Sequence, residues 1–199
     1  MKQWLIMDKT NTIIYIKNMV CPNCLLIIRN IFKQEDISIE SINWDKAAIK
    51  VDKLPQPYPE KVEKAIEPNG FKIISSYNEK VSEQIKITLI KWIYFSEEIV
   101  DKALFKELLE SKFQKEYYVL DQLFKKINGY SISGYFDLLR LERFKELVSY
   151  NENSFTEISL SLGFNDFEEI QHLVRTNLNC SISKFKKTSF YHRKPIDHL

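Results

Sequence analysis

The 199-residue sequence predicts an α+β protein in which a mixed N-terminal domain is followed by an all-α domain. Two observations predict this class. In the first 76 residues, short β-branched and aromatic runs alternate with apolar helical stripes, which is typical of strands paired with helices. After residue 78, apolar residues recur at helical spacing, and the stretch 105–133 repeats at 155–183 without a gap. We therefore expect domains at residues 1–77 and 78–199.

The N-terminal domain is expected to have the element order βαββαβ. Strands are expected over Thr12–Lys17, Ile37–Trp44, Ala47–Val51 and Phe71–Ile74, and helices over Cys21–Phe32 and Pro59–Ile66. Asp45-Lys46 and Asn69-Gly70 supply turns before the third and fourth strands. Pro suits the first helical position because its missing N–H leaves no bond unmade there. This order within about 65 residues fits a ferredoxin-like split βαβ unit, with both helices on one face of a four-stranded antiparallel sheet.

The 50-residue repeat predicts two copies of one small helical unit in the C-terminal domain. Helices are expected over Asn78–Tyr94, Ala103–Glu110, Glu116–Ile127 and Ser133–Ser149, with a turn through Lys112 and a C-cap at Asn128-Gly129. In the second copy, Ser154 and Glu157 suit a capping box, Gly163 ends the helix, and Asp166 and Glu169 suit another box. Each copy is then a helix-turn-helix, at about 102–127 and 154–178. The helix 133–149 would be a spacer that holds the second helices about one DNA turn, roughly 34 Å, apart.

Composition and charge exclude several function classes. The net charge is +2, and residues 1–80 hold 12 of the 29 basic and 10 of the 27 acidic groups, which leaves 17 of each for the rest. The C-terminal domain has no basic excess, which by itself counts against nucleic-acid binding. No apolar run approaches a membrane span of about 20 residues, and the first seven residues are too short for a secretory signal. Four glycines and no Ser-His-Asp grouping argue against an enzyme. Three cysteines make no disulfide framework, so we expect a cytoplasmic protein without a membrane partner.

A CxxC motif, Met19-Val20-Cys21-Pro22-Asn23-Cys24, lies on the loop between the first strand and the first helix. Two thiolates three positions apart at a helix N-terminus can bind one ion, and we expect the helix dipole and free amides to lower their pKa. Soft sulfur ligands select Cu(I) or Zn(II). These residues resemble the heavy-metal-associated domain, whose Met-x-Cys-x-x-Cys pattern and closing Gly-aromatic pair match here, the latter at Gly70-Phe71. The resemblance covers roughly residues 12–76 and implies metal at Cys21 and Cys24.

Three interpretations of the CxxC stay open: a metal site, an inherited fold whose cysteines meet no metal, and a thiol-disulfide site. One copy gives zinc only half of a tetrahedral shell. Cu(I), which accepts few soft ligands, or Zn(II) shared between two subunits fits better. Cys180, His172, His192 and His198 add no ligand spacing, and we interpret them as a loop residue and surface imidazoles.

The C-terminal residues also resemble a known family. Leu139–Leu147, followed by Glu157–Phe164, is similar to the AraC-type (AraC/XylS) DNA-binding domain, in which an Ile-Ala-x-x-x-Gly-Phe segment follows an Arg-Leu-Glu-Arg spacer helix. The resemblance spans about residues 80–190, with both repeats and the spacer at family spacing. Together with the metal-associated fold, it implies a bacterial one-component transcriptional regulator whose partner is double-stranded DNA.

The second helix of each copy is expected to lie in the major groove. Contacts to bases or phosphates are expected from Lys115, Tyr118, Gln122, Lys125, Lys126, Asn165, His172 and Arg175. Gln122 can bond adenine bidentately, and the lysines can neutralise phosphates. Glu168 and Glu169 are unusual near phosphates, so we expect the first copy to carry most of the sequence recognition. Arg140 and Arg143 are interpreted as surface or ion-pair residues of the spacer helix.

The leading hypothesis is a DNA-binding regulator that responds to a soft metal but needs none for DNA binding. Metal at the CxxC would order its loop or bridge two protomers of a homodimer. A second hypothesis is a soluble metal carrier or interaction protein that does not bind DNA. A third is a thiol oxidoreductase.

Overall fold

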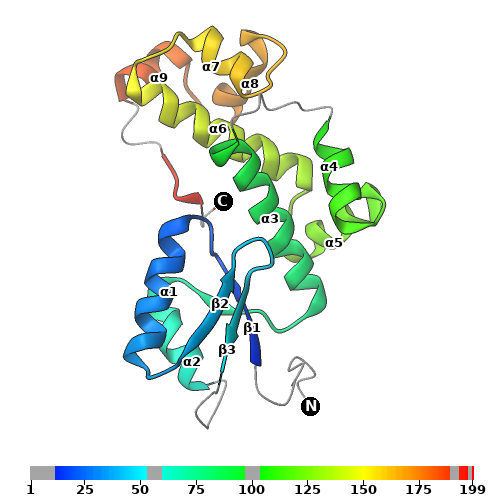
Figure 1. The fold of residues 1–199 in the computed structure, drawn as a ribbon. Helices are drawn as coiled ribbons and strands as arrows, with labels where there is room; N and C mark the ends of the chain where they lie inside the picture. The colour runs from blue at the N-terminus through cyan, green and yellow to red at the C-terminus, as the bar shows by residue number, and fades with distance from the viewer. Residues whose placement is uncertain (1–11, 53–59, 97–103, 189–192, 197–198) are drawn as a thin grey trace. The chain divides into compact units, whose positions relative to one another are not determined.

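The computed structural model describes residues 12–52, 60–96, 104–188, 193–196 and 199, with the side chains of 186–188 left aside. These residues form an α+β fold, which confirms the predicted class. The chain divides into two compact units, residues 1–88 and 89–199. The division lies inside helix α3 (Tyr77–Phe95), so one continuous helix contributes residues to both units (Figure 1). A boundary before this helix was expected from the sequence.

The first unit contains a four-stranded antiparallel sheet. Its elements are β1 (Thr12–Lys17), α1 (Pro22–Gln34), β2 (Ile39–Asn43), β3 (Ala48–Val51), α2 (Glu60–Ile66), the 3-10 helix η1 (Glu67–Asn69) and β4 (Lys72–Ile73). The strand order is β2-β3-β1-β4, with Ile14 of β1 paired to Ile49 of β3. The elements follow the expected order, although β2 and β4 are shorter than expected. Pro59, expected to begin the second helix, lies outside the described residues.

Helices pack on both faces of this sheet. Ile14 and Ile16 of β1 are buried in one core together with residues of α1 and α2 such as Phe32, and these two helices lie on one side of the sheet in Figure 1. Because side chains alternate along a strand, Tyr15 faces the other side. There the ammonium group of Lys80, on α3, lies 3.9 Å from the centre of the Tyr15 ring. The start of α3 thus contacts the face opposite α1.

The second unit contains helices and no strands among its described residues. Besides the end of α3 it contains α4 (Leu104–Phe113), α5 (Tyr117–Asn128), α6 (Ile132–Tyr150), α7 (Phe155–Ser161), α8 (Phe167–Leu178) and α9 (Ile182–Thr188). The expected turn through Lys112 is wrong, because α4 continues past it to Phe113. The chain turns instead at Gln114, whose φ of 51° is left-handed and whose side-chain amide donates to the Ser111 carbonyl at the helix end. In the second copy the turn lies at Gly163, as expected, with φ 71°.

The sequence repeat is also a repeat of packing. Phe105 packs edge-on against Tyr117, and the corresponding Phe155 stacks on Phe167. Left-handed residues end the second helix of each copy, at Gly129 (φ 82°) and Asn179 (φ 51°). Asn is the non-glycine residue that best tolerates this conformation, which explains why it replaces Gly at the equivalent position.

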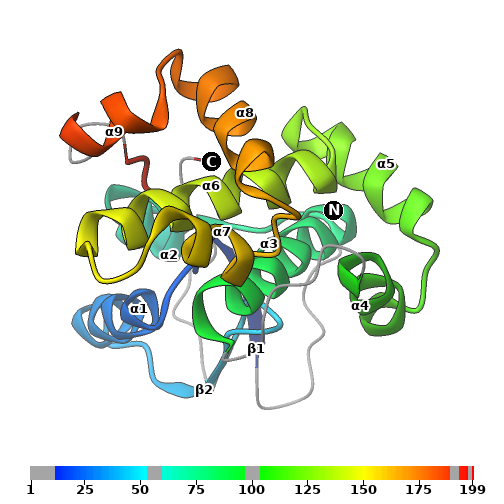
Figure 2. The same ribbon diagram turned by 90° about the horizontal axis from the view of Figure 1, so that it is seen from above.

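A third helix completes each copy. The side chain of Ser131 caps α6, and the side chain of Ser181 accepts from Lys184 N at the start of α9. We define the first head as α4, α5 and the start of α6, and the second head as α7, α8 and α9. The body of α6 is the spacer between them. Figure 2 shows α5 at one end of α6 and the helices α7 to α9 along the rest of it.

The two predicted capping boxes differ in outcome. At Ser154 and Glu157 both reciprocal hydrogen bonds are present, so this prediction is confirmed. The box at Asp166 is wrong in one half. Asp166 accepts from Glu169 N at 2.8 Å, but the Glu169 carboxylate accepts from the backbone N of Asn165 instead of that of Asp166.

Within the described part of the chain, no helix is long and apolar enough to cross a bilayer.

Candidate nucleic-acid interface and thiol pair

The outward face of α5 carries most of the expected DNA contacts of the first head. Tyr118, Gln122, Lys125 and Lys126 are all exposed, and their spacing places them on one stripe of the helix. Lys115, just before α5, is exposed as well. The opposite side of α5 is fixed in the core by fully buried side chains such as Phe124. Every contact expected from the first head is therefore accessible.

Val119 is a member of this stripe that the sequence did not single out. Its side chain is 47% exposed, and helical spacing places it at the edge of the stripe, next to Lys126. An apolar side chain of this kind can contact the methyl group of thymine in the major groove. β-branched residues are usually packing residues, so the sequence contains no signal that distinguishes this one.

Acidic residues near α5 are engaged by the backbone. The Glu110 carboxylate accepts from the backbone N of Tyr117 at 2.6 Å, and the Asp121 carboxylate accepts from the backbone N of Ile132 at 2.7 Å. Asp121 thus connects α5 to the start of α6. The exposed stripe itself carries the two lysines Lys125 and Lys126 and no carboxylate. This local charge favours phosphate, although the unit as a whole has no basic excess.

The outward face of α8 has a different charge balance. His172 and Arg175 are exposed at positions equivalent to Gln122 and Lys125, and Glu168 is exposed beside them. Asn165 is exposed too, but its amide group donates to Glu169 at 3.2 Å. The outward face of α8 therefore presents one permanent cation and one carboxylate, whereas the α5 stripe presents two cations.

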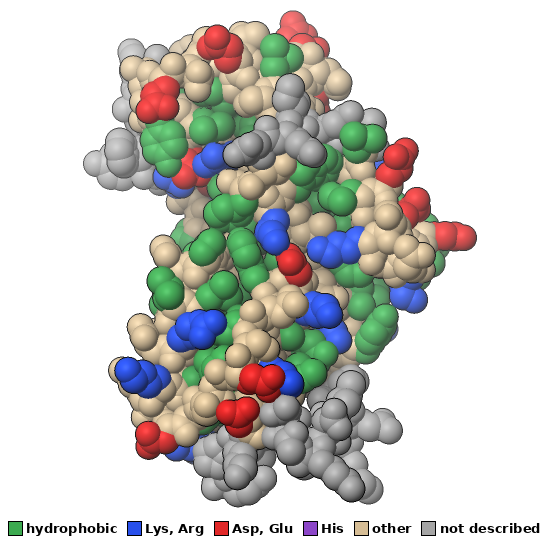
Figure 3. Space-filling view, in the orientation of Figure 1, with side chains coloured by type: hydrophobic (Ala, Val, Ile, Leu, Met, Phe, Trp, Pro, Cys, Tyr) green, Lys and Arg blue, Asp and Glu red, His purple; other side chains and the backbone are tan. Residues whose placement is uncertain are grey.

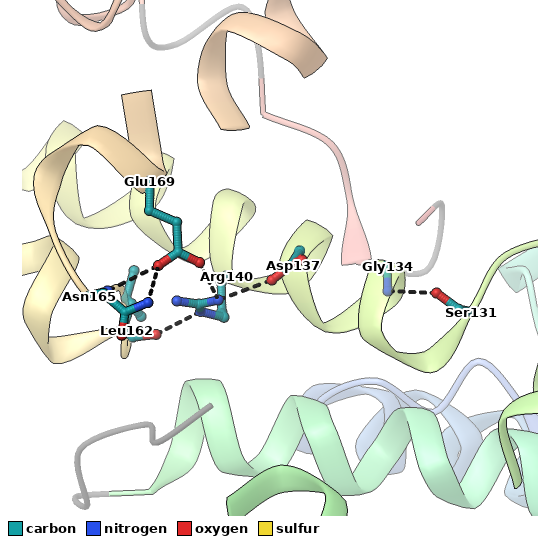
Figure 4. A network of polar contacts seen from close by, with 7 residues as sticks. All are labelled: Ser131, Gly134, Asp137, Arg140, Leu162, Asn165 and Glu169. Carbon is teal, nitrogen blue, oxygen red and sulfur yellow. Dashed lines mark hydrogen bonds and ion pairs between the residues drawn. The ribbon is translucent and has the colours of Figure 1, made fainter. Parts of the chain in front are cut away.

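Arg140 explains why an acidic residue stands at position 169. The expectation of a surface position is wrong, because the Arg140 side chain is 0% exposed, but the expectation of an ion pair is confirmed (Figure 4). Its Nε donates to the Leu162 carbonyl at 2.7 Å, and its NH1 lies 3.0 Å from Asp137 and 3.9 Å from Glu169. Burial lowers the pKa of Arg140, and the two carboxylates oppose that shift. Glu169 belongs to this network, which gives its carboxylate a structural role.

The guanidinium group also stacks on an aromatic ring. Its central carbon lies 3.5 Å from the centre of the Phe164 ring. Phe164 and Leu162 flank Gly163 in the turn of the second head, so Arg140 attaches this turn to the spacer helix from two sides. Arg143, one turn later, pairs with Glu146 at 3.0 Å, as expected for an ion-pair residue.

Two residues near the C-terminal end of the sequence contact acids of α6. The backbone N of Lys194 donates to Glu142 at 3.0 Å, and Arg193 lies 3.6 Å from Glu146. On the face drawn in Figure 3, Lys and Arg side chains are separated by apolar, acidic and neutral surface.

The two thiols of the CxxC lie together at the start of α1. Their Sγ atoms are 3.3 Å apart, Cys21 is the N-cap residue, and Pro22 is in the first turn. The expected lowering of the pKa is wrong for Cys24. Burial, with a smaller contribution from the hydrogen bond to Cys21, raises the pKa of Cys24 to about 11. Its side chain is only 8% exposed, so loss of hydration outweighs the helix N-terminus.

The loop before Cys21 is held from several elements. The indole N–H of Trp44 donates to the Met19 carbonyl. Asn18, with φ 72°, donates its side-chain amide to the Gly70 carbonyl at 2.8 Å and its backbone N–H to Glu83 at 2.6 Å. The Met19 side chain is fully buried. The sequence placed Met19 and Gly70 in a motif but gave no sign of the roles of Asn18, Trp44 and Glu83.

The donor set of this pair fits a soft ion of low coordination number. Among the described residues, no cluster of three or more His, Cys, Asp or Glu side chains is placed to hold a metal. Two thiols therefore leave tetrahedral zinc half coordinated in one chain. Cu(I) accepts soft ligands in small number, so Cys21 and Cys24 fit it better. His172 lies on the exposed face of α8, and His192 and His198 lie outside the described residues.

Two separate features of the chain are thus candidate functional sites. One is the exposed polar stripe on α5 with its weaker counterpart on α8, and the other is the thiol pair at α1. Comparison with protein-family models, with characterised proteins and with solved structures finds no match to this chain. Its function is therefore argued from these residues and their geometry.

Proposed function

We propose that this protein is a sequence-specific DNA-binding transcriptional regulator of the AraC type. In this proposal each head is a helix-turn-helix unit, with α5 and α8 as the helices that lie in the major groove. The observation that carries the proposal is the accessibility of all eight expected contact residues, six of them on the equivalent helices α5 and α8 and the other two, Lys115 and Asn165, just before these helices. Their inward neighbours, such as Leu120 and Ile170, are fully buried. Side chains without a packing role thus gather on the face that would meet a duplex.

The two heads are proposed to contribute unequally. Gln122 has the hydrogen-bonding groups to recognise adenine, Val119 the methyl groups for thymine, and Lys125 and Lys126 the charges for flanking phosphates. On α8, Arg175 has one phosphate-binding charge, and the nearby Glu168 opposes it. The first head would therefore determine most of the sequence preference, and the second would mainly fix the position of the protein on DNA.

The N-terminal unit is proposed to be a ferredoxin-like domain that binds a soft metal at Cys21 and Cys24. Its strand order β2-β3-β1-β4 and its antiparallel pairing agree with that proposal. The metal would act as an effector and not as a requirement for DNA binding, because the α5 stripe contains no metal ligand. A homodimer that shares Zn(II) between two thiol pairs is the variant of this proposal that satisfies tetrahedral coordination.

A selection experiment tests the DNA-binding proposal. The purified chain is incubated with a library of random duplexes, and bound duplexes are amplified and sequenced over several rounds. We expect enrichment of a sequence that contains A·T pairs, since Gln122 and Val119 favour adenine and thymine. Substitution Gln122→Ala should relax the preference at one position by about 1–3 kcal/mol. Absence of any enriched sequence at low salt would refute the proposal.

A soluble metal carrier is the second candidate, and the half-buried Cys21 favours it because a carrier must offer a thiol to its partner. The two candidates differ at low salt, where even non-specific DNA binders associate with a duplex. A carrier would remain unbound at low salt and would exchange Cu(I) with a chelator through Cys21.

A further inference from the structure

The loop that carries the thiol pair is bonded to α3 by one buried carboxylate. The backbone N–H of Asn18 donates to Oε1 of Glu83 at 2.6 Å. Asn18 lies three positions before Cys21 in the chain. Its left-handed conformation, with φ 72°, directs the chain from the end of β1 into the loop. A short hydrogen bond from a backbone amide to a carboxylate is among the stronger kinds, and here it fixes the conformation of this residue.

Glu83 is an unusual residue to find in this position. Its side chain is 2% exposed, so its carboxylate is taken out of water. Burial raises the pKa of Glu83, whereas the Asn18 amide and the nearby charges of Lys86 and Lys17 oppose that shift. A buried acid of this kind destabilises the fold unless its hydrogen bond is made. Glu83 acts on the loop in particular, because the group that donates to its carboxylate is the backbone N–H of Asn18.

We propose that Glu83 is a positioning residue for the Cys21–Cys24 metal site, and that it couples metal binding at this site to helix α3. This inference rests on the metal-responsive part of the proposed function. Glu83 does not touch the metal. It holds Asn18, and through the chain of Met19 and Val20 it sets where the Sγ of Cys21 lies relative to Cys24.

Metal binding has to separate the two sulfur atoms. Two sulfurs on one tetrahedral zinc ion are about 3.8 Å apart, because each Zn–S bond is about 2.3 Å long, and a linear Cu(I) pair needs a larger separation. The Sγ atoms lie 3.3 Å apart, so they must separate. Cys24 is inside α1 and packed in the core, whereas Cys21 is at the N-cap and less buried. The displacement therefore falls on Cys21, the residue at the end of the loop.

The hydrogen bonds of the loop determine which elements a displacement of Cys21 affects. The Trp44 indole and the Gly70 carbonyl connect the loop to segments next to the sheet strands. Glu83 connects it to α3, which continues beyond residue 88 into the second unit. A metal that shifts the loop therefore changes the Asn18–Glu83 contact, and by reciprocity a change at Glu83 alters the affinity for metal.

Three variants of the full-length protein test this coupling. Glu83→Ala removes the acceptor, Glu83→Gln keeps an acceptor oxygen but removes the charge, and Gln84→Ala is the matched control. Gln84 is the next residue on α3, and its amide donates to the Lys46 carbonyl at 3.1 Å, so the control removes a contact of α3 that does not involve the loop. The affinity for Cu(I) is measured under reducing conditions by competition with a chromophoric chelator.

We expect Glu83→Ala to bind Cu(I) about tenfold more weakly than the wild type, at the low end of the effect of removing supporting hydrogen bonds around a metal site. Glu83→Gln should lose about threefold, because a neutral acceptor makes a weaker bond to the same amide. Gln84→Ala should bind like the wild type. In amide hydrogen exchange, Cu(I) should alter protection at residues 80–88 of the wild type and of Gln84→Ala, and not of Glu83→Ala.

Each outcome decides between the proposals. If Glu83→Gln and Glu83→Ala bind Cu(I) as tightly as the wild type and Gln84→Ala do, the inference is overturned and the metal site itself is not. Absence of Cu(I) binding by the wild type overturns both the inference and the metal-effector proposal, and leaves DNA binding to be judged by duplex selection. If Glu83→Ala is unfolded by circular dichroism, the affinity and exchange of Glu83→Gln decide the result.

Discussion

Truncation of Arg140 tests how the second head is attached to the spacer helix. Arg140→Ala removes a buried hydrogen bond to the Leu162 carbonyl, an ion pair to Asp137 and a stacking contact with Phe164. Removal of one partner from a buried charged network costs about 3–5 kcal/mol, because the groups left behind lose their compensation. Asp137 and Glu169 are each partly exposed and regain water, so we use the lower end of this range.

The expected loss is therefore about 3 kcal/mol of the free energy of unfolding of the helical unit, or a fall of roughly 10 °C in its melting temperature. Urea unfolding followed by circular dichroism measures it. Arg140→Lys is the control, since it keeps the charge but loses the planar fork and most of the stacking, and it should lie between wild type and Arg140→Ala. A loss below 1 kcal/mol for Arg140→Ala would show that the network is not a stabilising attachment.

Three further predictions follow from single residues. Alkylation of Cys24 by iodoacetamide at pH 8, followed by mass spectrometry, should be at least about a hundredfold slower than alkylation of a free cysteine. A pKa of about 11 instead of 9.0 lowers the thiolate fraction of Cys24 by that factor. Equal rates would contradict the burial of Cys24. Gly129→Ala should lower the free energy of unfolding, measured in urea, by about 1 kcal/mol. The loss comes from backbone strain alone, because φ is 82° and an added Cβ would meet nothing within 4 Å. An unchanged free energy of unfolding would contradict the left-handed cap. The raised pKa of Glu83 means that the folded state binds its proton more tightly than the unfolded state, so its contribution to stability is present below about pH 4.3 and is lost as pH rises through the folded pKa. Wild type should therefore lose stability relative to Glu83→Gln as the pH rises above 4.5, and a constant difference would contradict the shift.

The sequence predicted those parts of the fold that depend on local pattern. The α+β class and the helices with long apolar stripes were recognised because periodicity reports burial directly. The cap at Gly129 and the box at Ser154 were recognised because a helix end favours particular residue types within a few positions. These residues satisfy the backbone groups that the helix leaves without a partner. The exposed stripe on α5 was recognised for the same reason, since the repeat and the periodicity place its residues on one face.

Features that depend on contacts distant in sequence were not predictable in this way. Arg140 has the composition of a surface residue, and its burial results from packing against Leu162 and Phe164 in another helix pair. The raised pKa of Cys24 follows from burial in the core of the first unit, which outweighs the local effect of a helix N-terminus. Glu83 lies 65 positions from Asn18, so nothing in either local sequence indicates their hydrogen bond.

The salt dependence of binding to a selected duplex tests the central claim, that the α5 stripe binds DNA. Wild type is compared with the double variant Lys125→Ala/Lys126→Ala and with a control that loses the same charge from α1, Arg29→Ala/Lys33→Ala, whose side chains are also exposed. Fluorescence anisotropy is recorded from low to physiological salt. We predict that the α5 variant binds more weakly and that its slope of log affinity against log salt falls by about 2, one for each lost phosphate contact, while the control keeps the wild-type slope. An unchanged slope in the α5 variant, or the same loss in the control, would contradict the proposed interface.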